Sequence, residues 1–155
     1  MSELRELYQE VILDHNKSPR NFGAMENPTH QAAGYNPLCG DRYNIYIRLR
    51  DDVIEEIRFE GNGCAISKAS ASLMTESLKG INKAEAEVLF EEVHDMLTGK
   101  KDMASVDAEK LNKLVVLSGV SEFPVRVKCA TLAWHAMHQA LEAMDTSADT
   151  KVSTE

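Results

Sequence analysis

Cysteine is scarce in this chain of 155 residues, which has only three, at positions 39, 64 and 129. No two of them are close enough to form a Cys-x-x-Cys pair. The low number excludes the dense disulfide framework that holds many small secreted domains together. It favours thiol or metal chemistry at isolated cysteines instead.

Long hydrophobic runs are also missing, since none approaches the roughly 20 residues that a membrane-spanning helix needs. The first residues, Met1 to Glu6, lack a basic segment followed by an apolar one, so we expect no signal peptide and a cytoplasmic location. Basic residues are outnumbered, with 17 lysines and arginines against 25 aspartates and glutamates and a net charge of −8. This diffuse acidity argues against nucleic acid or an anionic membrane as the main partner.

Hydrophobic residues make up 43% of the chain, which is enough for the core of one domain. Apolar spacing and turn residues predict two strands joined by a turn at Asp51-Asp52, with Val53, Ile57 and Phe59 on one face of the second strand. The predicted strands cover 43–49 and 53–59, with a possible short one near 31–35. The predicted helices cover 3–16, 66–79, Asn82 to Gly99, 107–117 and 125–144.

This order of elements predicts an α+β fold, in which helices pack on one face of a small antiparallel sheet of about three strands. We expect one domain over residues 1–145. Residues 146–155 are polar and are predicted to be a disordered tail.

The cysteines and one aspartate form the most informative pattern. Cys39 and Asp41 share a bent loop before the first long strand, and Cys64 follows the second strand. If these strands form a hairpin, Cys39, Asp41 and Cys64 come together. Cys129 lies far along the chain, near the start of the last predicted helix, where the helix dipole favours a thiolate. Three thiolates and a carboxylate would complete one tetrahedral metal site.

Two interpretations of these residues remain open at this point. Zinc accepts such ligands, and an iron–sulfur cluster is also compatible with them. Alternatively, Cys64 and Cys129 are small buried hydrophobic residues and Asp41 is a turn residue.

Three segments carry a family resemblance: 36–41 (Asn-Pro-Leu-Cys-Gly-Asp), 61–67 (Gly-Asn-Gly-Cys-Ala-Ile-Ser) and 123–134, which ends in Cys-Ala-Thr-Leu-Ala-Trp. They resemble the U-type iron–sulfur cluster assembly proteins, SufU and IscU, of the NifU N-terminal-like family, over roughly residues 4–144. Lys128 stands where the IscU type has a histidine, and residues from about 99 to 117 fit an insertion of the SufU branch. The chain therefore looks like a member of that branch.

The resemblance implies a zinc ion held by Cys39, Asp41, Cys64 and Cys129. It further implies a sulfurtransferase-like role with a SufS-type cysteine desulfurase, which the chain would stimulate while Cys39 accepts persulfide sulfur and Arg126 supports it. Recipients would be a downstream iron–sulfur scaffold or apo-proteins. The alternative is a scaffold that binds iron and a nascent [2Fe–2S] cluster for transfer to apo-proteins. His135 and His138 are interpreted as surface or packing residues.

Overall fold

The computed structural model describes residues 2–37, 40–100, 111–142 and 150–153. Its elements in chain order are α1 (Ser2–Lys17), β1 (His30–Asn36), β2 (Asp41–Arg50), β3 (Val53–Asn62), α2 (Ala65–Leu78), α3 (Lys83–Thr98), the 3-10 helix η2 (Asn112–Glu122), α5 (Pro124–Glu142) and β4 (Thr150–Ser153).

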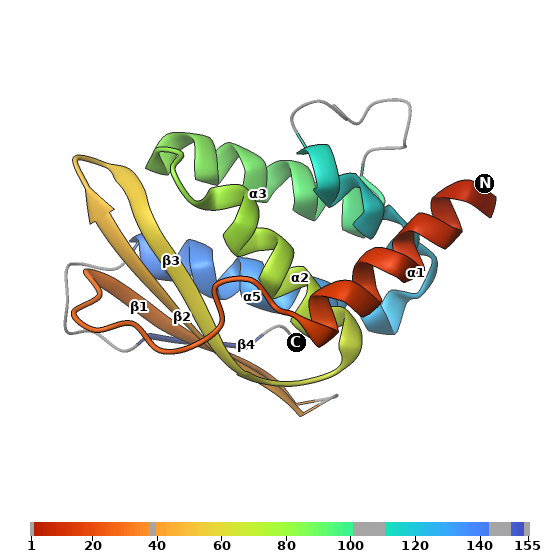
Figure 1. Cartoon of the computed structure of the whole chain (residues 1–155), viewed down its shortest axis with the longest axis horizontal. Helices are drawn as coiled ribbons and strands as arrows, with labels where there is room; N and C mark the ends of the chain where they lie inside the picture. Colours follow the sequence, from red (N-terminus) through yellow and green to blue (C-terminus); the bar gives the residue numbers. More distant parts are fainter. Residues whose placement is uncertain (1, 38–39, 101–110, 143–149, 154–155) are drawn as a thin grey trace.

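The sheet has the strand order β3-β2-β1-β4, and both β1/β2 and β2/β3 are antiparallel pairs. Helix α5 packs on β1 and β2, while α2 packs on β3 and on α5. Figure 1 shows the helices gathered on one side of the sheet, with α5 running behind its strands. The predicted α+β class, with helices on one face of an antiparallel sheet, is confirmed.

The β2–β3 hairpin turns at Asp51 and Asp52, whose φ angles of 54° and 64° suit a tight hairpin turn. Its register shifts near the turn, because Leu49 pairs with Ile54 while Arg48 pairs with Glu56. The extra residue is a β-bulge that reverses the alternation of β3. Ile54 is therefore buried, whereas Val53 is 38% exposed. The prediction that Val53 shares the buried face of Ile57 was wrong for this reason.

The region before α5 differs from the helix predicted over 107–117. Residues 101–110 lie outside the described part of the chain, and the following residues form the 3-10 helix η2 rather than an α-helix. Leu111, Leu114 and Leu117 are almost completely buried in the core. The later part of the predicted insertion thus contributes to the core as well as lengthening the chain.

The predicted disordered tail also differs from the structure at Thr150–Ser153, which form β4 and pair parallel with β1. The outer edge of β1 offers unpaired backbone donors and acceptors, and an added strand satisfies them. The remaining tail residues, 146–149 and 154–155, lie outside the described residues.

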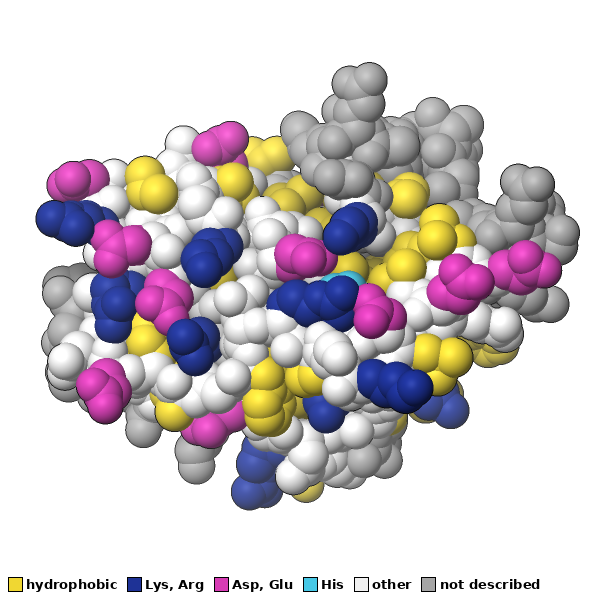
Figure 2. Space-filling model, in the orientation of Figure 1, with side chains coloured by type: hydrophobic (Ala, Val, Ile, Leu, Met, Phe, Trp, Pro, Cys, Tyr) yellow, Lys and Arg dark blue, Asp and Glu magenta, His cyan; other side chains and the backbone are white. Residues whose placement is uncertain are grey.

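Charged side chains of both signs are interspersed over the face shown in Figure 2, without a continuous basic surface there. None of the helices in the described residues is long and apolar enough to cross a bilayer.

Candidate metal centre

Asp41, Cys64 and Cys129 come together in the folded chain. One potential ligand atom from each lies within 4.8 Å of the others. Asp41 and Cys129 are buried, and Cys64 is partly exposed. Neither cysteine is in a disulfide. The cluster therefore brings two thiol sulfurs and a carboxylate to one point near the surface.

The hairpin places Asp41 beside Cys64. Asp41 begins β2 and Cys64 follows the end of β3, where Arg42 is paired with Asn62. The backbone N–H of Cys64 donates to Oδ1 of Asp41 at 2.8 Å, and the other carboxylate oxygen lies 3.8 Å from the Cys64 sulfur. One oxygen thus fixes the loop while the other faces the thiol.

Gly63 makes this approach possible because it has no side chain. A Cβ atom at this position would lie 2.5 Å from Oδ1 of Asp41 and 2.6 Å from Oγ of Ser67. Both distances are far shorter than a non-bonded contact allows. The glycine is therefore required for the carboxylate to reach the Cys64 backbone.

Cys64 is also the N-cap residue of α2. Its sulfur accepts from the backbone N–H of Ser67 at 3.4 Å, at the positive end of the helix dipole. Cys129 is the sixth residue of α5 and so lies in its second turn. From the sequence we expected the helix dipole to stabilise a thiolate at Cys129. The dipole acts mainly on the first turn of a helix, so in the structure it is Cys64 that benefits from it.

Packing of α5 brings Cys129 to the site. Trp134 donates from Nε1 to Oγ of Ser70 at 3.1 Å, and Ser70 donates to the carbonyl of Ala130 at 2.6 Å. These buried bonds lock α5 onto α2 next to the cysteine. Asn36, at the end of β1, approaches the Cys129 sulfur with its Nδ2 at 4.0 Å.

The pKa values of two tyrosines, Tyr43 and Tyr8, reflect the burial and the charges around the site. Burial raises the pKa of Tyr43 to about 12; Asp41 and the two cysteines add to that rise, and a hydrogen bond with Ser67 opposes it. Burial also raises the pKa of Tyr8, with Arg126 opposing and Cys64 adding. Both phenols therefore remain protonated near neutral pH.

The cluster geometry does not test two predicted site residues, Cys39 and Arg126. Cys39 lies outside the described residues. Arg126 is exposed near the start of α5, and its charge acts on Tyr8. Their functional roles stay predictions.

The donor set fits a cation. Asp41 is fully buried, and among the described residues no lysine or arginine forms an ion pair with it. A buried carboxylate beside two thiols is costly unless a positive charge compensates it. Sulfur and oxygen donors at this spacing suit zinc, and thiolates also suit iron–sulfur clusters.

Sequence reasoning missed three residues that support the cluster: Asn36, Tyr43 and Ser67. Ser67 had a readable signal, since it stands three positions after Cys64, where an N-capping side chain meets the backbone. The sequence indicated only that Asn36 belongs to a loop motif and that Tyr43 belongs to a strand.

Comparison with known proteins identifies relatives over most of the chain. Residues 7–130 match the family model described as NifU-like N terminal domain. The chain is 42% identical over 140 residues to the "Zinc-dependent sulfurtransferase SufU" of Bacillus subtilis (strain 168), covering 90% of this chain and 92% of that protein. It is 38% identical over 142 residues to the "Iron-sulfur cluster assembly scaffold protein IscU" of Streptococcus pyogenes serotype M1, covering 92% of this chain and 87% of that protein.

A solved structure agrees with these matches. The putative iron–sulfur cluster assembly scaffold protein for the SUF system from Fervidobacterium islandicum AW-1 superposes with a TM-score of 0.81 at 34% identity. The match covers 88% of this chain and 98% of that chain.

Proposed function

Because the chain belongs to the NifU-like N-terminal domain family, we propose that it acts in iron–sulfur cluster assembly as a zinc-dependent sulfur acceptor. The donor would be the persulfide of a SufS-type cysteine desulfurase. The observation that carries this proposal is the convergence of Asp41, Cys64 and Cys129 within 4.8 Å. The similarity to a zinc-dependent sulfurtransferase supports it.

Zinc is the proposed resident metal, with Asp41, Cys64 and Cys129 as ligands and Cys39 as the fourth. Cys39 stands two positions before Asp41, which is the first residue of β2. When bound, zinc lowers the basicity of its thiolate ligands and keeps them deprotonated. The hydrogen bond from the Cys64 backbone N–H to the buried Asp41 carboxylate ties the end of β3 to the start of β2.

Sulfur transfer to Cys39 exchanges one sulfur–sulfur bond for another and needs no added oxidant or reductant. The Cys39 thiolate attacks the terminal sulfur of the desulfurase persulfide, and a new sulfur–sulfur bond forms. The bond between that sulfur and the desulfurase cysteine breaks, and this cysteine leaves as a thiolate. Arg126, exposed at the start of α5, is proposed to attract the anionic sulfur species.

Desulfurase turnover with and without the protein tests this proposal. We expect the wild-type chain to raise the rate and to acquire a persulfide on Cys39. Cys39→Ala should abolish both effects, whereas Lys83→Gln, at the start of α3 beside the turn of the hairpin, should not. If Cys39→Ala stimulated turnover as well as the wild type, the acceptor role would be wrong.

A second candidate function uses the same ligands. The similarity to proteins named as IscU scaffolds favours a role in holding a nascent [2Fe–2S] cluster for apo-proteins. Anaerobic reconstitution with iron and sulfide distinguishes the two. A stable visible chromophore that Asp41→Ala abolishes would favour the scaffold, and a colourless protein that retains one tightly bound zinc would favour the sulfur acceptor.

A further inference from the structure

A second group of ligand-type side chains lies between α3 and α5, away from the cysteines. Glu87 on α3 and His138 and Glu142 on α5 each offer an atom within 4.8 Å of the other two. His138 and Glu142 are four residues apart and therefore share one helix face. His138 is nine residues beyond Cys129, about 14 Å along the helix axis. The group is thus distinct from the thiol cluster.

The contacts within this group leave donor atoms available. Nδ1 of His138 lies 2.6 Å from Oε2 of Glu87. Despite this short distance, Nδ1 makes no hydrogen bond, and Oε1, the other carboxylate oxygen of Glu87, is also buried without a hydrogen-bond partner in the described chain. Phe90 stacks on the His138 ring at 4.7 Å with an interplanar angle of 4°. The imidazole is therefore held in place by an apolar contact while its nitrogen faces a carboxylate.

The two carboxylates of this group, those of Glu87 and Glu142, have no lysine or arginine partner in the part of the chain that the structure describes. A bound divalent cation would neutralise both and satisfy the buried oxygen and nitrogen.

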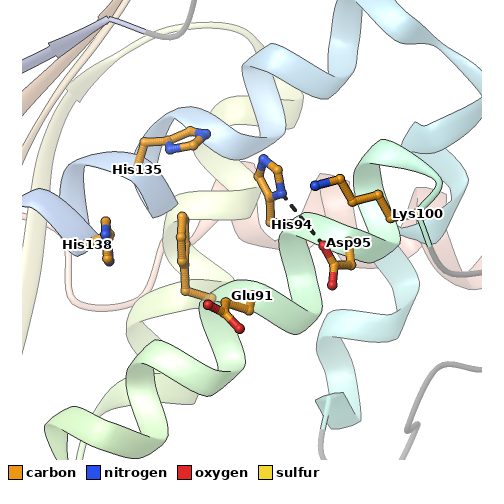
Figure 3. Close-up of a pocket in the computed structure, with 7 residues that line it drawn as sticks. Glu91, His94, Asp95, Lys100, His135 and His138 are labelled. Carbon is orange, nitrogen blue, oxygen red and sulfur yellow. Dashed lines mark ion pairs between the residues drawn. The ribbon is translucent and has the colours of Figure 1, made fainter.

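A pocket of about 530 Å³ adjoins His138 and opens the region to solvent. Figure 3 shows His135 and His138 on α5 across from His94 on α3. The His94 and His135 rings meet edge to face at 5.5 Å. Burial, with the neighbouring His94 and His138, lowers the pKa of His135, and Lys100 is the lysine among the residues that line the pocket.

We propose that Glu87, His138 and Glu142 form a second divalent-metal site, with nitrogen and oxygen donors. One imidazole and two carboxylates suit ions such as Zn²⁺ and Co²⁺, and they lack the sulfur that soft ions prefer. Three protein ligands leave a coordination position for water. The site therefore binds an exchangeable metal.

Cobalt binding tests this site separately from the thiol cluster, because sulfur ligands give cobalt an intense charge-transfer band. The full-length protein is first given one equivalent of Zn²⁺ and then titrated with Co²⁺. We expect a second equivalent to bind without the sulfur band. Glu87→Gln, His138→Gln and Glu142→Gln each remove a ligand and should weaken this second equivalent by at least about 10- to 100-fold, the loss seen when only an outer-shell partner is removed. The first equivalent should be unchanged.

Glu91→Gln and His94→Gln are matched controls, because they remove the same kinds of group from the next two turns of α3. Both should retain the second equivalent. Glu142 is exposed, so Glu142→Gln tests the site without disturbing the core. The site would be wrong if the wild type bound one metal only, if the three variants bound as tightly as the wild type, or if the controls lost binding equally.

Discussion

Replacing Gly63 by alanine perturbs the candidate metal centre without removing any donor atom. The new Cβ would lie 2.5 Å from Oδ1 of Asp41 and 2.6 Å from Oγ of Ser67. Asp41 is fully buried, so its carboxylate has no free space to enter. The side chain or the loop must shift by on the order of 1 Å to restore an ordinary contact.

The shift should lower both the free energy of unfolding and the affinity for zinc. Breaking the 2.8 Å bond leaves the Cys64 N–H without its carboxylate acceptor, and crowding adds strain, for a total of about 1–3 kcal/mol. For a chain of this size that lowers Tm by about 2–4 °C per kcal/mol. Ligand distances tolerate displacements of only about 0.2 Å. Zinc affinity should therefore fall on the order of 10- to 100-fold.

Competition with a chromophoric chelator measures the zinc affinity, and thermal unfolding measures stability. Gly119→Ala is the matched control, since its Cβ would meet only Tyr8 at 3.5 Å, an ordinary contact. We expect this control to keep the wild-type zinc Kd. A Gly63→Ala variant with wild-type Kd and Tm would refute the argument that Asp41 is held by the absence of a side chain at 63.

Three further predictions concern stability. Removing zinc with a chelator should lower Tm, because the proposed ligands join β2, α2 and α5; equal melting temperatures would contradict that. The buried His15 bonds Ser72 at 2.6 Å, and burial first and Arg20 second lower its pKa from 6.5, with Glu76 opposing. As the pH falls, the unfolded chain therefore takes up the His15 proton before the folded chain does. The free energy of unfolding should keep its full His15 contribution above about pH 6.5 and decrease as the pH drops below it. Denaturant titrations at several pH values should show this slope, and His15→Gln should flatten it. Asn82→Ala removes the capping box of α3 and should cost about 1 kcal/mol without changing zinc affinity; a change in zinc Kd would show unexpected coupling.

Part of the site could be predicted from local pattern alone. Alternating apolar residues and the Asp51-Asp52 turn predict a hairpin, and a hairpin necessarily brings Asp41 near Cys64. The approach of Cys129 could not be derived in this way. It depends on how α5 packs against α2 through Ser70 and Trp134, a contact between residues 64 positions apart.

Other features of the structure could not be predicted from the sequence, for physical reasons. The bulge that exposes Val53 follows from the register of β2 and β3, which alternation does not determine. β4 forms because β1 has a free edge, although three of its own four residues are polar. The proximity of His138 to Glu87 could not be predicted, because Glu87 belongs to a different helix and no spacing rule connects them.

The coordination of one equivalent of zinc tests the central claim most directly. X-ray absorption at the zinc edge should show sulfur at about 2.3 Å and oxygen at about 2.0–2.2 Å, with a best fit of three sulfurs and one oxygen. Cys64→Ser should lose one sulfur and Asp41→Ala the protein oxygen. A shell of nitrogen and oxygen alone in the wild-type protein would contradict the assignment of Asp41, Cys64 and Cys129 as the zinc ligands.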